Sequence, residues 1–139
     1  MSSRWLSGLS ALLLAFPALA ALPLTPFEQA PTQPLPRSAV ISKYLHELDA
    51  ASPLASVTQL GLSAGKRPVE ALLISEEPEF LREGRPSSQR LTVMLVGSQH
   101  GNEPSGTEVL QILARRLPDG ELTPWLQQHN FVVVALANP

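Results

Sequence analysis

The spacing of apolar and polar positions changes along the chain, and each spacing predicts a different element. From residue 38 to residue 51, apolar side chains recur at intervals of three and four residues, as they do on one face of an α-helix. This apolar stripe consists of Val40, Ile41, Tyr44, Leu45 and Leu48. We therefore predict a helix over residues 38–51, with Ser38 as its N-cap because a serine hydroxyl accepts hydrogen bonds from free backbone N–H groups.

Two short β-type runs follow within residues 57–75, on either side of the segment 61–65, which begins and ends with glycine. These glycines, together with Lys66 and Arg67, predict a hairpin whose tip is exposed to solvent. Residues 77–90 contain two prolines, a glycine and two serines. This composition is typical of a solvated loop, so we predict no regular element there.

A strand–helix–strand unit is predicted in the last third of the chain. Residues 91–97 (LTVMLVG) and 131–137 (FVVVALA) are continuous apolar runs, which are typical of strands covered on both faces. Residues 107–117 place Val109, Leu110, Leu113 and Leu117 on one helical face. Such a βαβ unit pairs its strands in parallel through a right-handed crossover. The predicted fold class is therefore α/β, with a mixed central sheet flanked by helices.

The first 37 residues predict two segments outside the folded domain. Within residues 1–20, Arg4 precedes a short apolar run, and Ala18-Leu19-Ala20 offers the small-x-small pattern that signal peptidase reads. The apolar run is shorter than the roughly 20 residues of a membrane-spanning helix, so we predict a signal peptide and export to the periplasm or outside the cell. An uncleaved membrane anchor is the alternative. Residues 21–37 are rich in proline, which predicts an extended leader without a helix.

Composition narrows the possible functions. Hydrophobic residues make up 44% of the 139 residues, enough for a packed core. The net charge of -2 argues against a nucleic-acid partner, and the absence of cysteine excludes disulfides and thiolate metal sites. The sequence stops at Asn138-Pro139, directly after the second apolar strand. We expect it to be the front part of a longer protein.

Candidate chemistry lies in VGSQHGNEPSG, residues 96–106, where the first apolar strand gives way to the helix. In open α/β sheets, ligands bind beyond the carboxyl ends of the strands. His100 and Glu103 lie at that edge, and imidazole nitrogen and carboxylate oxygen are both zinc ligands. Gly97 and Gly101 are expected to permit the tight turn that brings the two side chains together. The alternative is that Glu103 caps the helix that begins at Pro104.

Three segments, in this order, resemble the zinc metallocarboxypeptidases, the carboxypeptidase A/B-like peptidases. LGLSAGKRPVEALLIS resembles the family's G-x-S-x-x-G-R-x-I hairpin, VMLVGSQHGNEPSG contains its H-x-x-E zinc motif, and FVVVALANP resembles the strand that leads into N-P-D-G. The resemblance covers residues 38–139 and implies the N-terminal part of the catalytic domain. It implies that His100 and Glu103 are the first two ligands of one Zn²⁺ ion. The third ligand, a histidine, and the catalytic glutamate are expected downstream of Pro139, so no catalytic residue is assigned within this chain.

The resemblance implies a zinc-dependent carboxypeptidase that removes C-terminal residues from peptides, with this chain alone expected to be inactive. His46 and His129 are expected to be surface histidines. HGNE also resembles the succinylglutamate desuccinylase and aspartoacylase-like branch, so a deacylase or a cell-wall peptide amidase is the alternative enzyme. A non-catalytic binding module with the same fold is the alternative of another class.

Overall fold

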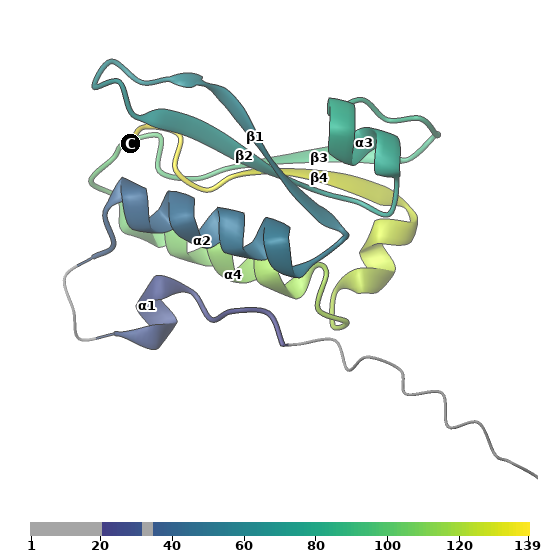
Figure 1. Cartoon of the computed structure of the whole chain (residues 1–139), viewed down its shortest axis with the longest axis horizontal. Helices are drawn as coiled ribbons and strands as arrows, with labels where there is room; N and C mark the ends of the chain where they lie inside the picture. Colours follow the sequence, from purple (N-terminus) through teal and green to yellow (C-terminus); the bar gives the residue numbers. More distant parts are fainter. Residues whose placement is uncertain (1–20, 32–34) are drawn as a thin grey trace, which may run out of the picture.

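The computed structural model describes residues 21–31 and 35–139, which form a four-stranded sheet with two long helices beneath it (Figure 1). The predicted α/β class with a mixed, helix-flanked sheet is confirmed. In chain order the elements are α1 Pro26–Gln29, α2 Ser38–Ala51, β1 Ala55–Leu62, β2 Pro68–Ile74, α3 Pro78–Glu83, β3 Leu91–Val96, α4 Pro104–Arg116, the 3₁₀ helix η1 Thr123–Gln127, and β4 His129–Val134. The predicted signal peptide at residues 1–20 lies outside the described residues. Within the described ranges, no helix has the length and apolarity needed to cross a bilayer.

The sheet has the order β1-β2-β4-β3. β1 pairs with β2 and β2 with β4 in antiparallel fashion, whereas β3 and β4 are parallel neighbours with Val93 opposite Phe131. The predicted hairpin is confirmed, and its tip is closed by a 2.8 Å hydrogen bond from the Ser63 N–H to the Arg67 carbonyl oxygen. The predicted βαβ unit is also confirmed, since α4 joins two parallel strands. The handedness of its crossover stays a prediction.

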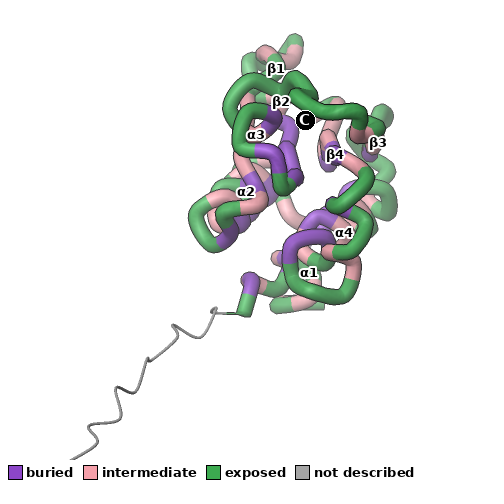
Figure 2. The backbone as a smooth tube through the Cα atoms, turned by 90° about the vertical axis from the view of Figure 1, so that its right-hand side faces the viewer, coloured by how far each residue is buried: buried purple, intermediate pink, exposed green. Residues whose placement is uncertain are grey.

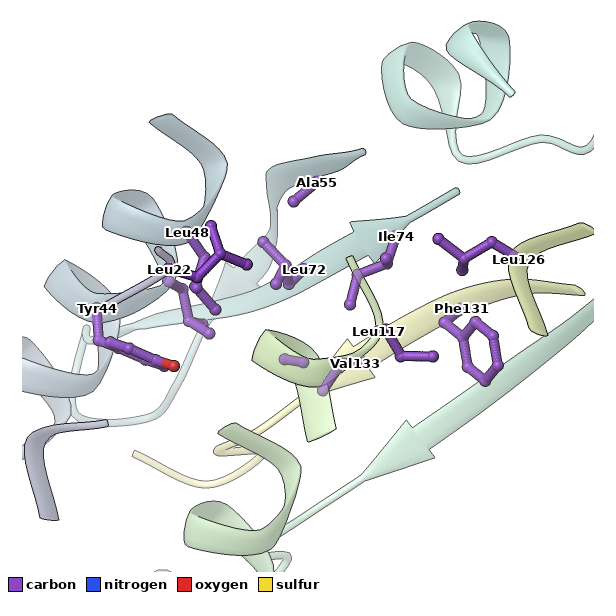
Figure 3. Close-up of a cluster of buried hydrophobic side chains, with 12 residues drawn as sticks. Leu22, Tyr44, Leu48, Ala55, Leu72, Ile74, Leu117, Leu126, Phe131 and Val133 are labelled. Atoms are coloured by element: carbon purple, nitrogen blue, oxygen red, sulfur yellow. The ribbon is translucent and has the colours of Figure 1, made fainter. Parts of the chain in front are cut away.

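The core lies between one face of the sheet and the two long helices. Leu72 and Ile74 of β2 and Phe131 and Val133 of β4 share this face, because the strands pair Leu72 with Val133 and Ile74 with Phe131. Figure 3 shows these side chains facing Tyr44 and Leu48 from α2 and Leu117 from the end of α4. Buried positions accordingly gather on the inner sides of the helices and strands in Figure 2.

Helix α2 has the predicted bounds, but two details of the prediction are wrong. Arg37 is the N-cap residue and no side chain caps the helix, because Ser38 is already its first helical residue. Val40 is 45% exposed; the buried face consists of Ile41, Tyr44, Leu45 and Leu48. The apolar stripe therefore included one position that turns to solvent.

The strand and helix around the candidate site are less covered than predicted. β3 is an edge strand, and the side chains that point away from α4 are exposed, Met94 by 60% and Val96 by 42%. The prediction that this strand is covered on both faces is thus wrong for the part of the chain that the structure describes. On α4, Val109 is 62% exposed, whereas the buried positions include the polar residues Thr107 and Gln111.

The proline-rich leader contains a helix, contrary to the prediction. The Thr25 hydroxyl accepts a hydrogen bond from the Glu28 N–H at 3.1 Å, and the Glu28 carboxylate accepts one from the Thr25 N–H at 2.8 Å. This reciprocal capping box stabilises the short helix α1, and Pro26 fits because the first helical N–H has no intrahelical partner. Leu22 is only 8% exposed and belongs to the core, so the leader packs on the domain.

Residues 77–90 are also more ordered than the predicted solvated loop. They contain α3, whose Phe80 side chain is fully buried. Glu77 is 7% exposed, and its carboxylate accepts hydrogen bonds from the Ser87 N–H at 3.1 Å, from the Ser88 hydroxyl, and from the Asn130 amide at 3.2 Å. These hydrogen bonds, that of Ser88 first, lower the pKa of Glu77. A buried carboxylate therefore holds this segment against the start of β4.

Candidate metal centre at the carboxyl edge of the sheet

The candidate site is formed by two loops that leave the parallel strands β3 and β4 at the same edge of the sheet. The Gly97 N–H donates to the Val134 carbonyl oxygen at 2.9 Å, and the Ala137 N–H donates back to the Gly97 carbonyl oxygen at 3.0 Å. Further out, the Asn138 side-chain amide donates to the Gln99 carbonyl oxygen at 3.3 Å. The loop that carries His100 and Glu103 is therefore fastened to the segment after β4.

Two glycines allow the loops to approach this closely. A Cβ at position 97 would lie 2.7 Å from the Ala135 carbonyl oxygen, and one at position 101 would lie 2.6 Å from that of Asn138. Neither glycine has a positive φ. Gly97 and Gly101 are thus required for space, whereas the prediction had attributed them to the turn.

His100 and Glu103 lie side by side, with 3.3 Å between the imidazole Nδ1 and the carboxylate Oε2. The backbone forms a turn between them, in which the Glu103 N–H donates to the His100 carbonyl oxygen at 3.0 Å. Both side chains are open to solvent, with 74% and 67% of their surface exposed. Two donors bound at about 2.0–2.1 Å to one tetrahedral zinc ion are separated by about 3.3 Å. The spacing of these two atoms therefore fits a shared metal ion.

The structure also bears on the capping alternative for Glu103. Glu103 is the N-cap residue of α4 and Pro104 is its first helical residue, yet the Glu103 side chain makes no capping hydrogen bond. Its carboxylate instead points to His100.

A buried pair of hydroxyl groups lies beneath this turn. Ser98, 6% exposed, donates its hydroxyl to the Glu103 carbonyl oxygen at 2.6 Å. The hydroxyls of Ser98 and Thr107 are 2.6 Å apart, and the Thr107 hydroxyl is 2.9 Å from the Ala135 carbonyl oxygen, to which it donates. Ser98 has a φ of 41°, a left-handed conformation that a non-glycine residue adopts at an energetic cost.

The other two histidines lie elsewhere. His46 Nε2 is 3.1 Å from Glu70 Oε1 and its side chain is 57% exposed, as predicted for a surface histidine. His129 begins β4, at the opposite edge of the sheet from His100. It is half-buried, with its Nδ1 3.2 Å from the Trp125 carbonyl oxygen. No group of three metal-ligating side chains occurs among residues 21–31 and 35–139, so the described residues provide two donors for one ion.

A cavity of about 410 Å³ opens beside the loop that carries His100 and Glu103. Its wall comes from the start of α2, the hairpin tip, the first turns of α4 and the segment after β4. The polar and charged side chains in this wall include Arg37, Arg67, Asn102, Glu108 and Asn138. Burial raises the pKa of Glu108. An open space with both apolar and charged side chains in its wall therefore adjoins the candidate metal centre.

A family profile described as zinc carboxypeptidase matches residues 41–139 of the chain. No curated protein matches it. Among solved structures, the carboxypeptidase A of Helicoverpa armigera is similar with a TM-score of 0.61 and 19% identity, over 76% of this chain and 25% of that one. A metallo-carboxypeptidase from Burkholderia cenocepacia is similar with a TM-score of 0.61 and 18% identity, over 73% of this chain and 26% of that one. These likenesses show the fold, and the matched part of the chain spans about a quarter of the length of each relative.

Proposed function

Since the chain belongs to the zinc carboxypeptidase family, we propose that the complete protein is a zinc-dependent carboxypeptidase that removes C-terminal residues from peptides. The family membership predicted from three sequence segments is confirmed by the match over residues 41–139. We further propose that His100 and Glu103 are two ligands of one Zn²⁺ ion in the complete enzyme.

One observation carries the ligand proposal. The His100 Nδ1 and the Glu103 Oε2 lie 3.3 Å apart, at the edge of the sheet where α/β proteins bind ligands, and the carboxylate has no capping role. A glutamate that served only the helix would turn its oxygens toward the free N–H groups of the first turn. The orientation toward His100 therefore favours ligation over capping.

Each side chain has a definite part in this proposal. His100 would donate a lone pair from an imidazole nitrogen, and Glu103 would donate one from a carboxylate oxygen. A zinc ion held there supplies Lewis acidity toward a peptide carbonyl and toward water. We expect a third ligand and a general base to come from residues beyond this chain. The chain alone is therefore expected to hydrolyse neither peptides nor acyl-amino acids.

The deacylase alternative rests on the two residues between the ligands, Gly101 and Asn102. Many digestive-type carboxypeptidases have a basic residue between their ligands, whereas this chain has none. The Asn138 carbonyl oxygen stands 2.6 Å from where a Cβ of residue 101 would be, so this loop leaves no room for a side chain there. The residues between the two ligands therefore bear on whether the complete enzyme acts on a peptide or on an N-acyl amino acid, and they leave the proposed metal ligands unchanged.

The test uses the full-length protein and its His100→Ala variant, with His46→Ala as the matched control because His46 is a solvent-exposed histidine remote from the site. We expect His100→Ala to lose its zinc and its release of C-terminal amino acids from peptides, while His46→Ala keeps both. Bound zinc is measured after dialysis, and hydrolysis is measured on a peptide and on an N-acyl amino acid. Full zinc occupancy in His100→Ala would contradict the ligand assignment, and hydrolysis of the N-acyl amino acid alone would favour the deacylase.

A further inference from the structure

We propose that Ser98 and Thr107 are positioning residues of the metal centre, which hold the turn that carries His100 and Glu103. This inference rests on the proposed function, because it assigns these hydroxyls a role in zinc binding. Neither side chain is expected to touch the metal ion or the substrate. Their effect passes through the backbone of Glu103.

The contacts link the candidate ligand directly to the sheet. Ser98 donates to the carbonyl oxygen of Glu103 at 2.6 Å, and Thr107 donates to the carbonyl oxygen of Ala135, just after β4, at 2.9 Å. The two hydroxyls are themselves 2.6 Å apart. These contacts bring together the segment after β4, the first turns of α4 and the backbone carbonyl of Glu103.

The contact between the two hydroxyls is what connects Glu103 to the segment after β4. The two groups carry two hydrogens for three contacts, and each hydroxyl has two lone pairs. Thr107 can donate to Ser98 while Ser98 donates to Glu103, or Ser98 can donate to Thr107 while Thr107 donates to Ala135. Removing either hydroxyl removes the contact between these two buried groups, which are 6% and 2% exposed, and with it the connection from Glu103 to Ala135.

The backbone of Ser98 points to the same role. Its φ of 41° is a conformation that glycine adopts without strain, so the backbone alone gives no reason for a serine here. Strained residues persist where the surrounding contacts hold them, and they gather at functional sites. The side-chain hydroxyl of Ser98 contacts Glu103 and Thr107.

The experiment measures Zn²⁺ affinity of the full-length protein by competition with a chelator. Side chains that support a metal ligand typically contribute a factor of 10 to 100 in metal affinity. Because these hydroxyls hold the ligand's backbone, we expect Ser98→Ala and Thr107→Val each to weaken zinc binding by about tenfold. Thr107→Ser keeps the hydroxyl and is expected to bind zinc as the wild type does. Ser98→Gly also removes the hydroxyl but relieves the backbone, so it provides a variant that folds without strain.

The matched control is Ser75→Ala. Ser75 is a fully buried serine whose hydroxyl donates to the Asn130 side chain at 2.5 Å. It lies near the start of β4, at the opposite edge of the sheet from His100 and Glu103. This variant is expected to lower the melting temperature without changing zinc affinity. The absorption spectrum of the Co²⁺-substituted protein gives a second readout, since it reports ligand geometry. We expect it to change in Ser98→Gly and to stay the same in Ser75→Ala.

Two results overturn the inference. If Ser98→Ala, Ser98→Gly and Thr107→Val lower the melting temperature but leave zinc affinity and the Co²⁺ spectrum unchanged, the hydroxyls are structural only. If the wild-type protein binds no zinc, or if His100→Ala binds zinc as tightly as the wild type does, the proposed function fails and this inference fails with it. The behaviour of His100→Ala therefore separates the two failures.

Discussion

Leu22 of the proline-rich leader packs in the core and is only 8% exposed. It lies nineteen positions before residue 41, where the family match begins. We predict that Leu22→Ala destabilises the full-length protein. Two other contacts hold the leader in place. The Tyr44 hydroxyl donates to the Pro23 carbonyl oxygen at 3.3 Å, and Arg115 Nη2 lies 2.9 Å from Glu28 Oε1.

The magnitude follows from burial. Replacing a buried leucine by alanine typically costs about 2–5 kcal/mol, the larger values occurring where the surroundings cannot collapse into the space. Leu22 belongs to a short segment at the rim of the core, so the segment can shift and close part of the cavity. We therefore expect a loss of about 2 kcal/mol. Leu24 lies two residues away but is 49% exposed, so Leu24→Ala should cost less than about 1 kcal/mol.

The assay is equilibrium unfolding in urea of the full-length wild type, Leu22→Ala and Leu24→Ala. A lower midpoint with an unchanged slope indicates a loss of stability rather than a change in the surface exposed on unfolding. The reasoning is refuted if Leu22→Ala and Leu24→Ala shift the midpoint equally and only slightly. In that case residues 21–31 are a linker, as the sequence had predicted, and do not belong to the core.

Two further predictions concern acid stability and processing. The pKa of Glu77 is lowered in the folded state below its ordinary value of 4.5, so its stabilisation is complete above that pH and is lost as the pH falls through the lowered value. Glu77→Gln should therefore melt at a lower temperature at neutral pH, and its melting temperature should fall less steeply than that of the wild type as the pH falls below 4.5. An acid dependence equal to that of the wild type would contradict the role of this carboxylate. The exported protein should begin at Ala21, because cleavage is predicted after Ala20; N-terminal sequencing that finds Met1 or Ser2 on exported protein would contradict the signal peptide.

The sequence predicted the long elements because their periods are clear. The helix of residues 38–51, the hairpin and the parallel pair of apolar strands are all present. Its errors lie where a local rule competes with tertiary contacts. Proline density argued against a helix in the leader, but proline at position 26 occupies a first helical turn, where no donor is lost. Composition predicted a solvated loop at residues 77–90, and a composition rule does not detect the one aromatic, Phe80, that anchors α3.

The candidate site was predicted in part. The H-x-x-E spacing and its position after an apolar strand identified His100 and Glu103 correctly as neighbours. Ser98 and Thr107 were missed because single polar residues in a glycine-rich loop and a helix are ordinary. One sequence feature indicates Thr107: it lies four residues before Gln111, and both residues are on the buried face of α4. Polar residues at helical spacing, together with an exposed apolar residue such as Val109, indicate a helix whose buried face is partly polar.

The two ends of α4 connect these findings. At its start, Thr107 and Ser98 fasten the helix to the segment after β4 and to the peptide group of Glu103. Near its end, Arg115 pairs with Glu28 of the leader at 2.9 Å, where only 14% and 28% of the two side chains are exposed. Arg115 also lies in the last turn of α4, where a positive charge suits the helix dipole. The helix that begins at the candidate zinc ligand is therefore contacted near its other end by a leader that precedes the family match.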